Sequence, residues 1–99
     1  MRIVDYYYLA YPDCRPADPE FAATELWVDL GEEGDTFEHH QGTYAFHTYT
    51  FQYAQREFFD QNKPLVGRSV MLVPTLADDW MSEFLAANVD SLAQWGELK

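Results

Sequence analysis

Residues 24–30 alternate between two kinds of side chain, and this pattern constrains the fold more than any other. The apolar positions are Leu26, Val28 and Leu30. The positions between and before them are Glu25, Trp27 and Asp29. Successive side chains of a β-strand point to opposite faces, so the pattern predicts a strand with one buried face and one face toward water.

Residues 2–9 are rich in β-branched and aromatic side chains, which favour a second strand. Strict alternation places Ile3, Tyr7 and Leu9 on one side of it. The same alternation places Val4, Tyr6 and Tyr8 on the other side. Apolar residues on both sides indicate an interior strand, or one whose outer face is covered. The segment 11–19, with three prolines, then predicts a loop.

Two more strands are expected further along the chain. Residues 31–35 contain two glycines and predict a turn, after which residues 43–50 would run antiparallel to 24–30. In this strand Tyr44 and Phe46 would face opposite to Ala45 and His47. Residues 67–73 end in an uninterrupted apolar run, which predicts a central strand covered on both faces.

The spacing of apolar residues changes to a helical period at Thr50, a suitable N-cap. The helical face that follows is expected to consist of Phe51, Ala54, Phe58 and Phe59. Residues 62–64 (NKP) would end this helix.

A longer helix is expected from Asp78 or Asp79 to Trp95, with both acids in its first turn, where the helix dipole favours anions. Its apolar face would consist of Met81, Phe84, Leu85, Asn88, Leu92 and Trp95. Gly96 is a natural stop for it. The predicted order is β-β-β-α-β-α. This is a single α+β domain over residues 1–99, with a mainly antiparallel four-stranded sheet and two helices packed on one face.

Cysteine content and hydropathy predict the compartment. Cys14 is the only cysteine, so there is no disulfide framework and no CxxC zinc pair. The first residues lack the apolar segment and cleavage site of a secretory signal. The longest later apolar run, residues 70–73, is too short to span a bilayer. We therefore expect a cytoplasmic protein.

Charge narrows the class of partner. The chain has 17 acids and 6 bases, a net charge of −11. Such a field repels nucleic acids and anionic membranes, and it attracts basic proteins. A stretch from Pro16 to Gln55 contains no Lys or Arg but holds eight of the acids. Solubility alone could explain the acidity, but its concentration in one stretch favours a charged binding surface.

Motifs for catalysis and for metal binding are weak. No P-loop, GxGxxG or GxSxG sequence is present. His39 and His40 are adjacent and would point apart in a strand, so we predict no metal site there. His47 is expected to be a packed or half-exposed strand residue rather than a general base, and Cys14 an inert thiol. We therefore predict no catalytic residue, no cofactor and no enzymatic activity.

A partner-binding surface is the functional site that the sequence favours. An aromatic anchor among acids is typical of an interface hot spot, and Trp27 would be that anchor unless a helix covers it. The acids of the main surface are expected to be Asp29, Glu32, Glu33, Asp35 and Glu38. A second candidate surface consists of Asp78, Asp79 and Glu83, although helix capping explains Asp78 and Asp79 more simply. A solvated acidic turn remains the plainer alternative for the main surface.

Three segments resemble the immunity protein 8 family of bacterial polymorphic toxin systems. They are residues 26–31 (LWVDLG), the aromatic strand 44–50 (YAFHTYT) and residues 67–73 (GRSVMLV), followed by a helix ending near Trp95. The resemblance covers roughly residues 26–95. It implies a cytoplasmic, non-enzymatic α+β protein that neutralises a cognate toxin. Such toxins often attack nucleic acids, and an acidic partner would block their basic clefts.

Other classes stay open on the sequence alone. A phage or mobile-element inhibitor that mimics nucleic acid would share the acidic surface. A small structural or dimerisation module would suit the high aromatic content, so the chain could be a monomer or a homodimer. A small enzyme or a metal-binding domain would be built around His39, His40 and His47.

Overall fold

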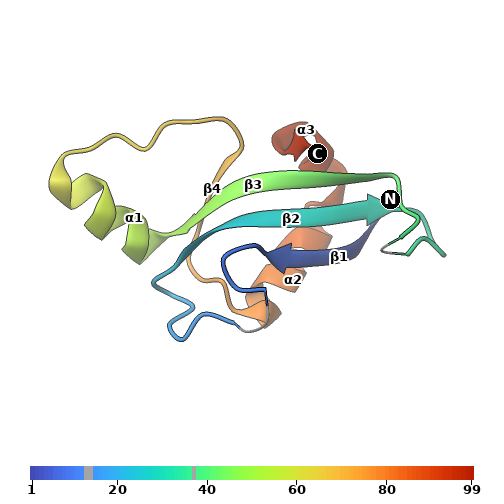
Figure 1. Cartoon of the computed structure of the whole chain (residues 1–99), viewed down its shortest axis with the longest axis horizontal. Helices are drawn as coiled ribbons and strands as arrows, with labels where there is room; N and C mark the ends of the chain where they lie inside the picture. Colours follow the sequence, from blue (N-terminus) through green and yellow to red (C-terminus); the bar gives the residue numbers. More distant parts are fainter. Residues whose placement is uncertain (13–14, 37) are drawn as a thin grey trace.

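A sheet built mainly from three consecutive strands forms the frame of the protein (Figure 1). The computed structural model describes residues 1–12, 15–36 and 38–99. The long strands are β1 (Arg2–Tyr8), β2 (Ala23–Gly31) and β3 (Gly42–Thr50). The short strands are β4 (Val70–Val73) and β5 (Glu97–Leu98). The helices are α1 (Phe51–Glu57), α2 (Asp78–Ala87) and α3 (Val89–Trp95), and a 3₁₀ turn η1 spans Phe59–Gln61.

The strands follow the order β1-β2-β3-β4. β1 and β3 each pair antiparallel with β2, while β4 pairs parallel with β3. β5 also pairs with β3, antiparallel and at the other end of the same edge. The predicted α+β class with a mainly antiparallel sheet is therefore confirmed, and β5 is an addition to it.

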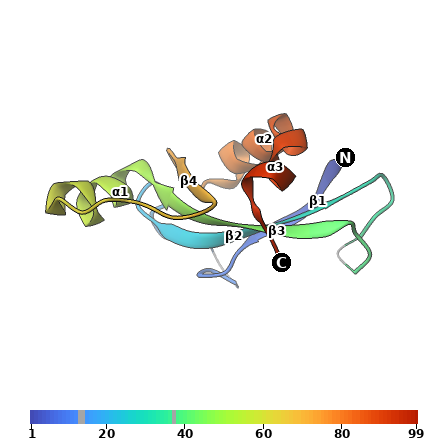
Figure 2. The ribbon, with the colours of Figure 1, turned by 90° about the horizontal axis from the view of Figure 1, so that it is seen from above.

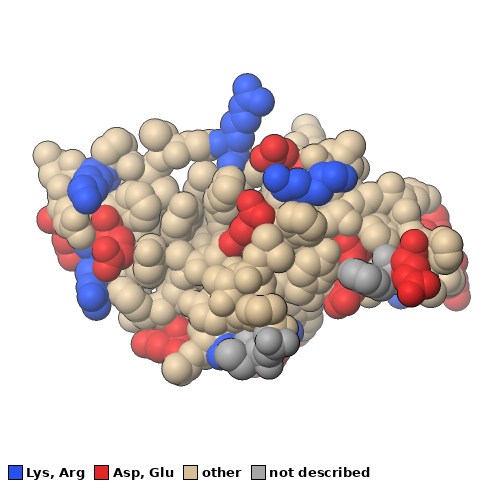
Figure 3. Space-filling model, viewed as in Figure 1, with Lys and Arg blue, Asp and Glu red and all other residues tan. Residues whose placement is uncertain are grey.

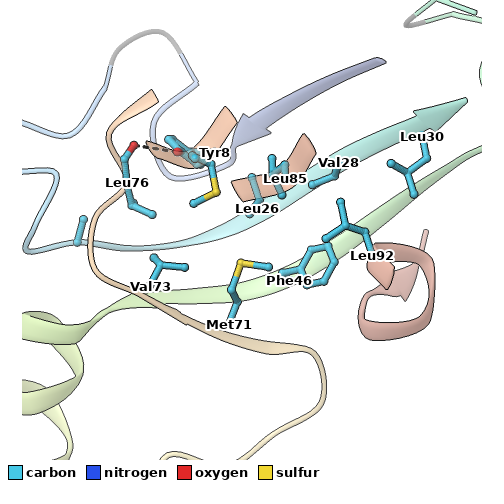
Figure 4. Packing of buried hydrophobic residues seen from close by; sticks show 12 residues of the cluster. Tyr8, Leu26, Val28, Leu30, Phe46, Met71, Val73, Leu76, Leu85 and Leu92 are labelled. Carbon is cyan, nitrogen blue, oxygen red and sulfur yellow. Dashed lines mark hydrogen bonds between the residues drawn. The ribbon is translucent and has the colours of Figure 1, made fainter. Parts of the chain in front are cut away.

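One face of the sheet is covered by α2 and α3 (Figure 2). Leu26, Val28 and Leu30 point into this layer and are fully buried, as their alternation predicts. The side chains that pack there form one hydrophobic cluster (Figure 4). It consists of Tyr8, Ala22, Leu26, Val28, Leu30, Phe46, Met71, Val73, Leu76, Met81, Leu85 and Leu92. Within the described residues no helix packs on the opposite side, which we call the open face (Figure 2).

β1 departs from strict alternation because it contains a bulge. Ile3 pairs with Leu30, yet Asp5 pairs with Asp29, so Val4 is an extra residue between them. The bulge brings Ile3 onto the helix-covered side with Tyr6 and Tyr8. The prediction that Ile3 shares a side with Tyr7 and Leu9 is therefore wrong, since one extra residue reverses the direction of every side chain before it.

β4 lies at the sheet edge, and the prediction of a central, doubly covered strand is wrong. Its apolar run of four residues alternates in burial: Met71 and Val73 are buried, whereas Leu72 is 44 % exposed on the open face. The run resembled a doubly buried strand because a short apolar segment looks the same whether one or both faces are covered.

α1 begins as predicted, with the Thr50 hydroxyl accepting a hydrogen bond from the Tyr53 backbone nitrogen. The predicted phenylalanine face is not its buried face, since Phe51 and Phe59 are both about half exposed. α1 extends beyond the end of the sheet instead of covering it (Figure 1). Only its Ala54 is fully buried. The two helices that cover the sheet face, α2 and α3, both belong to the C-terminal segment.

The C-terminal helix is broken at Asn88, which separates α2 from α3. The Asn88 backbone is non-helical, and its side-chain nitrogen donates to the Phe84 carbonyl at 2.9 Å. The break keeps Leu92 buried but leaves Trp95 nearly half exposed, against prediction. α3 stops before Gly96 as predicted, although Gly96 has an extended backbone rather than a left-handed one.

Candidate partner-binding surfaces

The loop of residues 32–41, which joins β2 to β3, presents the exposed acids of the main predicted surface. We call this segment the acidic loop. Glu32, Glu33 and Glu38 are exposed, while Asp35 is half-buried. Acidic side chains gather at this end of the molecule, and further acidic groups lie near the centre of the open face (Figure 3). The structure therefore keeps three of the five predicted acids accessible here.

Hydrogen bonds hold the backbone of the acidic loop at Glu32 and Asp35. Arg2 Nη2 donates to the Asp35 carbonyl at 3.1 Å, and Arg2 Nε donates to the Glu32 carbonyl at 3.2 Å. Because these bonds go to carbonyls, Arg2 orders the loop without pairing directly with a carboxylate. The amino group of Met1 lies 3.6 Å from Glu32 Oε2, so Glu32 has a weak cationic neighbour. Glu33 and Glu38 are the stronger candidates for a partner contact.

The side chain of Asp35 stabilises the turn at the start of the acidic loop and is not part of its exposed surface. Its Oδ2 accepts a hydrogen bond from the Glu32 backbone nitrogen at 2.7 Å. Gly31 makes room for this carboxylate, since a Cβ there would lie 2.8 Å from the Asp35 Cβ. Gly34 has a φ of +93°, as the predicted glycine turn requires. The carboxylate of Asp35 is thus already bound within the loop.

Asp29 is not on a water-exposed surface, and that expectation is wrong. Its side chain is 0 % exposed. Thr43 Oγ1 donates to Asp29 Oδ1 at 2.6 Å, and His40 Nε2 lies 2.9 Å from Thr43 Oγ1 and 3.4 Å from Asp29 Oδ1. The carboxylate therefore holds the end of the acidic loop to the sheet, and it cannot contact a partner directly. Burying it needs these bonds, because an unpaired buried charge is costly.

Trp27 lies on the open face, partly buried, and not within the acidic loop. Its Nε1 donates to Glu25 Oε2 at 2.6 Å, and its ring centroid is 6.1 Å from that of Tyr7. Gly31 lies four positions further along the strand, which is about 13 Å at the usual rise per residue. Trp27 and the exposed acids thus form two neighbouring surfaces rather than an anchor ringed by acids.

The second predicted surface is largely a structural cluster. Asp78 Oδ2 lies 3.0 Å from Arg15 Nε, and Asp78 Oδ1 accepts a hydrogen bond from the Tyr6 hydroxyl at 3.0 Å. The Arg15 guanidinium is 5.0 Å from the Tyr8 ring centroid. Asp78 therefore ties the loop before β2 to β1 and to α2. Asp79 is exposed in the first turn of α2, where the helix dipole favours an acid, as predicted.

The tyrosines of this cluster have raised pKa values. Burial, with the hydrogen bond to Asp78 as the second cause, raises the pKa of Tyr6 to about 12. Burial also raises the pKa of Tyr8, whose hydroxyl donates to the Leu76 carbonyl at 2.8 Å. Both hydroxyls are thus held in their neutral form by the fold.

An alkaline titration is expected to lower stability through these tyrosines. Unfolded tyrosines ionise near pH 10, whereas folded Tyr6 keeps its proton to about pH 12. The folded state therefore holds more protons between these values, and the free energy of unfolding should fall as pH rises through this window. Urea midpoints from pH 9 to 12 measure this loss of stability, and tyrosinate absorbance follows the ionisation of the tyrosines. In Tyr6→Phe the urea midpoint should fall less over this pH range. A midpoint of the unmodified protein that does not change with pH would contradict the raised pKa of Tyr6.

The histidines do not come together. His40 is near Asp29 and Thr43, while His47 Nδ1 lies 4.0 Å from Glu25 Oε1 on the open face. Among the residues that the structure describes, no group of three His, Cys, Asp or Glu could hold a metal ion. Cys14, expected to be inert, lies outside the described residues. Across the described ranges, no helix is both long and apolar enough to cross a membrane.

Comparisons with protein-family models, curated proteins and solved structures found no match. Any functional assignment therefore depends on the geometry and charge of the chain itself. That geometry offers the acidic loop and the open face as surfaces. Asp29 is buried, and the half-exposed Asp78 is already paired with Arg15.

Sequence reasoning missed four residues that organise these surfaces: Arg2, Tyr7, Arg15 and Glu25. The position of Arg2 had a signal, because pairing β1 with β2 sets Arg2 opposite Gly31, next to the turn. Glu25 also had one, since it lies two residues from Trp27 and therefore on the same strand face. Arg15 follows an irregular loop, and its contact with Asp78, 63 residues away, has no local signal.

Proposed function

We propose that this protein is a cytoplasmic immunity protein that binds a basic bacterial toxin and blocks its active-site cleft. The observation that supports this most is the acidic loop: Arg2 holds its backbone at Glu32 and Asp35, while the side chains of Glu33 and Glu38 are exposed at one end of the molecule. An ordered acidic projection suits insertion into a cationic cleft, since little conformational freedom is then lost on binding.

The overall charge supports the same partner. A net charge of −11 on 99 residues produces an attractive field for a cation-rich protein, and this field speeds encounter. The field would equally repel a nucleic-acid substrate from a toxin that the protein covers. The resemblance of residues 26–95 to the immunity protein 8 family implies the same class of function.

Reversing the charge of the acidic loop should slow binding. In the variant Glu32→Lys, Glu33→Lys, Glu38→Lys, association with the toxin domain encoded by the adjacent gene is expected to be about tenfold slower at low salt. The rate should also lose most of its salt dependence, because steering acts over a Debye length of about 30 Å at 0.01 M and about 10 Å at 0.1 M. Stopped-flow or surface-based kinetics at several salt concentrations measure both.

A matched control separates this loop from net charge. Glu20→Lys, Glu83→Lys, Asp90→Lys changes the charge equally, at exposed acids outside the loop. It should slow association clearly less than the loop variant. Equal slowing by both variants would show that the loop is not the binding surface. Failure of the unmodified protein to bind the adjacent toxin, or to protect cells that express it, would reject the proposed function.

A further inference from the structure

Two clusters of aromatic rings and a carboxylate lie on opposite sides of β1. On the helix-covered side, Tyr6, Tyr8 and Asp78 surround the guanidinium of Arg15. That guanidinium lies 6.0 Å from the Tyr6 ring centroid and 5.0 Å from the Tyr8 ring centroid, and Arg15 Nε is 3.0 Å from Asp78 Oδ2. The protein therefore already uses stacked rings and a carboxylate to hold an arginine.

The open face has the same kinds of group next to the same strand. The Tyr7 and Trp27 rings are 6.1 Å apart and tilted by 48°, and Glu25 Oε2 accepts the Trp27 indole hydrogen at 2.6 Å. The strand register assigns the side chains of β1, β2 and β3 that point to this face. They are Arg2, Asp5, Tyr7, Ala23, Glu25, Trp27, Asp29, Thr43, Ala45, His47 and Tyr49. The one cation of this set, Arg2, lies at the acidic-loop end and donates to the carbonyls of Glu32 and Asp35, so none of these strands places a Lys or Arg beside Trp27 and Glu25.

We propose that the open face binds an arginine side chain of a basic partner protein, with the guanidinium stacked on Trp27 and paired with Glu25. The inference rests on the proposed function, because the partner is the same basic protein that the acidic loop attracts. Arginine fits better than lysine here, since a planar guanidinium stacks on an indole and can also donate two parallel bonds to a carboxylate. Trp27 offers the most favourable ring for a cation.

Burial and charge favour this occupant over a second copy of the chain. Glu25 is 27 % exposed at its side chain, with Oε2 bonded to the indole and Oε1 4.0 Å from His47 Nδ1, so part of the side chain remains accessible beside the indole. Stacking two open faces would bring Asp5 and Glu25 of each copy toward acids of the other, at a net charge of −11 per chain. Like charges brought together across an interface are costly, whereas an arginine relieves the repulsion.

The test uses a short peptide of alternating arginine and glycine, and its lysine analogue, followed by nuclear magnetic resonance on the full chain. The Trp27 Nε1–H resonance reports directly on the site, and those of Trp80 and Trp95 serve as internal references. We expect a saturable shift of the Trp27 resonance with the arginine peptide and weaker binding of the lysine peptide. Glu25→Gln keeps an acceptor for the indole and should weaken arginine binding roughly threefold, on the scale of one exposed ion pair.

The control variant is Glu83→Gln, which removes an exposed acid from α2 and should leave the peptide affinity of the open face unchanged. Equal affinity in Glu25→Gln and the unmodified protein, or shifts confined to Trp80 and Trp95, would overturn the proposal. A dimer by sedimentation that protects Trp27 would also overturn it, in favour of a second copy. If the open face fails while the acidic-loop variant still slows toxin binding, the proposed function stands without this site.

Discussion

Leu85→Ala is expected to lower the free energy of unfolding by about 2–5 kcal/mol. Leu85 is fully buried on α2, where it belongs to the cluster that joins the helix layer to the sheet (Figure 4). Truncation removes its transfer free energy and leaves a cavity, because neighbours on β2 and α3 are held by their own elements. Urea unfolding followed by tryptophan fluorescence should show a lower midpoint with an unchanged slope.

The matched control is Leu98→Ala in β5, the same truncation at a side chain that is 64 % exposed. Its effect is expected to stay within about 0.5 kcal/mol. Equal losses at Leu85 and Leu98 would show that α2 does not pack on the sheet as described. A changed slope for Leu85→Ala would indicate altered compactness instead of a simple loss of stability.

Gly96→Ala is expected to destabilise the fold by about 1–3 kcal/mol through overpacking. A Cβ at this position would lie 2.7 Å from Phe46 Cζ and 2.9 Å from Tyr44 Cβ, so the chain between α3 and β5 would have to move away from β3. The backbone there is extended and open to any residue, so conformational strain plays no part. The thermal or urea midpoint measures the loss.

A double-mutant cycle with Phe46→Leu isolates the cause. The smaller side chain removes the ring that meets the new Cβ, so Gly96→Ala should cost less in that background than alone. Additive costs would mean that the ring is not the obstacle. A cost near zero for Gly96→Ala by itself would show that the last strand is not fixed against β3.

The fold was predictable for elements that have one buried face and one face toward water. Leu26, Val28 and Leu30 were assigned correctly because β2 has neighbours on both edges and one covered face. The bulge at Val4 was not predictable, since one extra residue in a strand has no pattern of its own. The edge position of β4 also had no signal, because the sequence does not show which faces and edges are covered. The break at Asn88 interrupts a helical pattern that continues on both sides.

The candidate site was predictable only for the acidic residues that lie in a polar turn. Glu33 and Glu38 belong to a polar loop, and such loops lie at the surface. The burial of Asp29 depends on Thr43 from another strand and on His40 from the loop, and the role of Asp78 depends on Arg15. Sequence spacing along one strand or helix cannot reveal partners that the tertiary fold supplies.

β4 and β5 pair with the same edge of β3, and this pairing has a consequence for self-assembly. Unpaired strand edges offer backbone groups to other chains and so promote aggregation. Residues 44–45 of β3 are closed by β5 and residues 47–50 by β4, so two short strands protect one long strand. At the opposite edge of the sheet, strand β1 is interrupted by its bulge, which keeps a neighbouring chain from aligning along it. The protein can therefore keep an aromatic-rich sheet face available to a partner while discouraging edge-to-edge growth of the sheet.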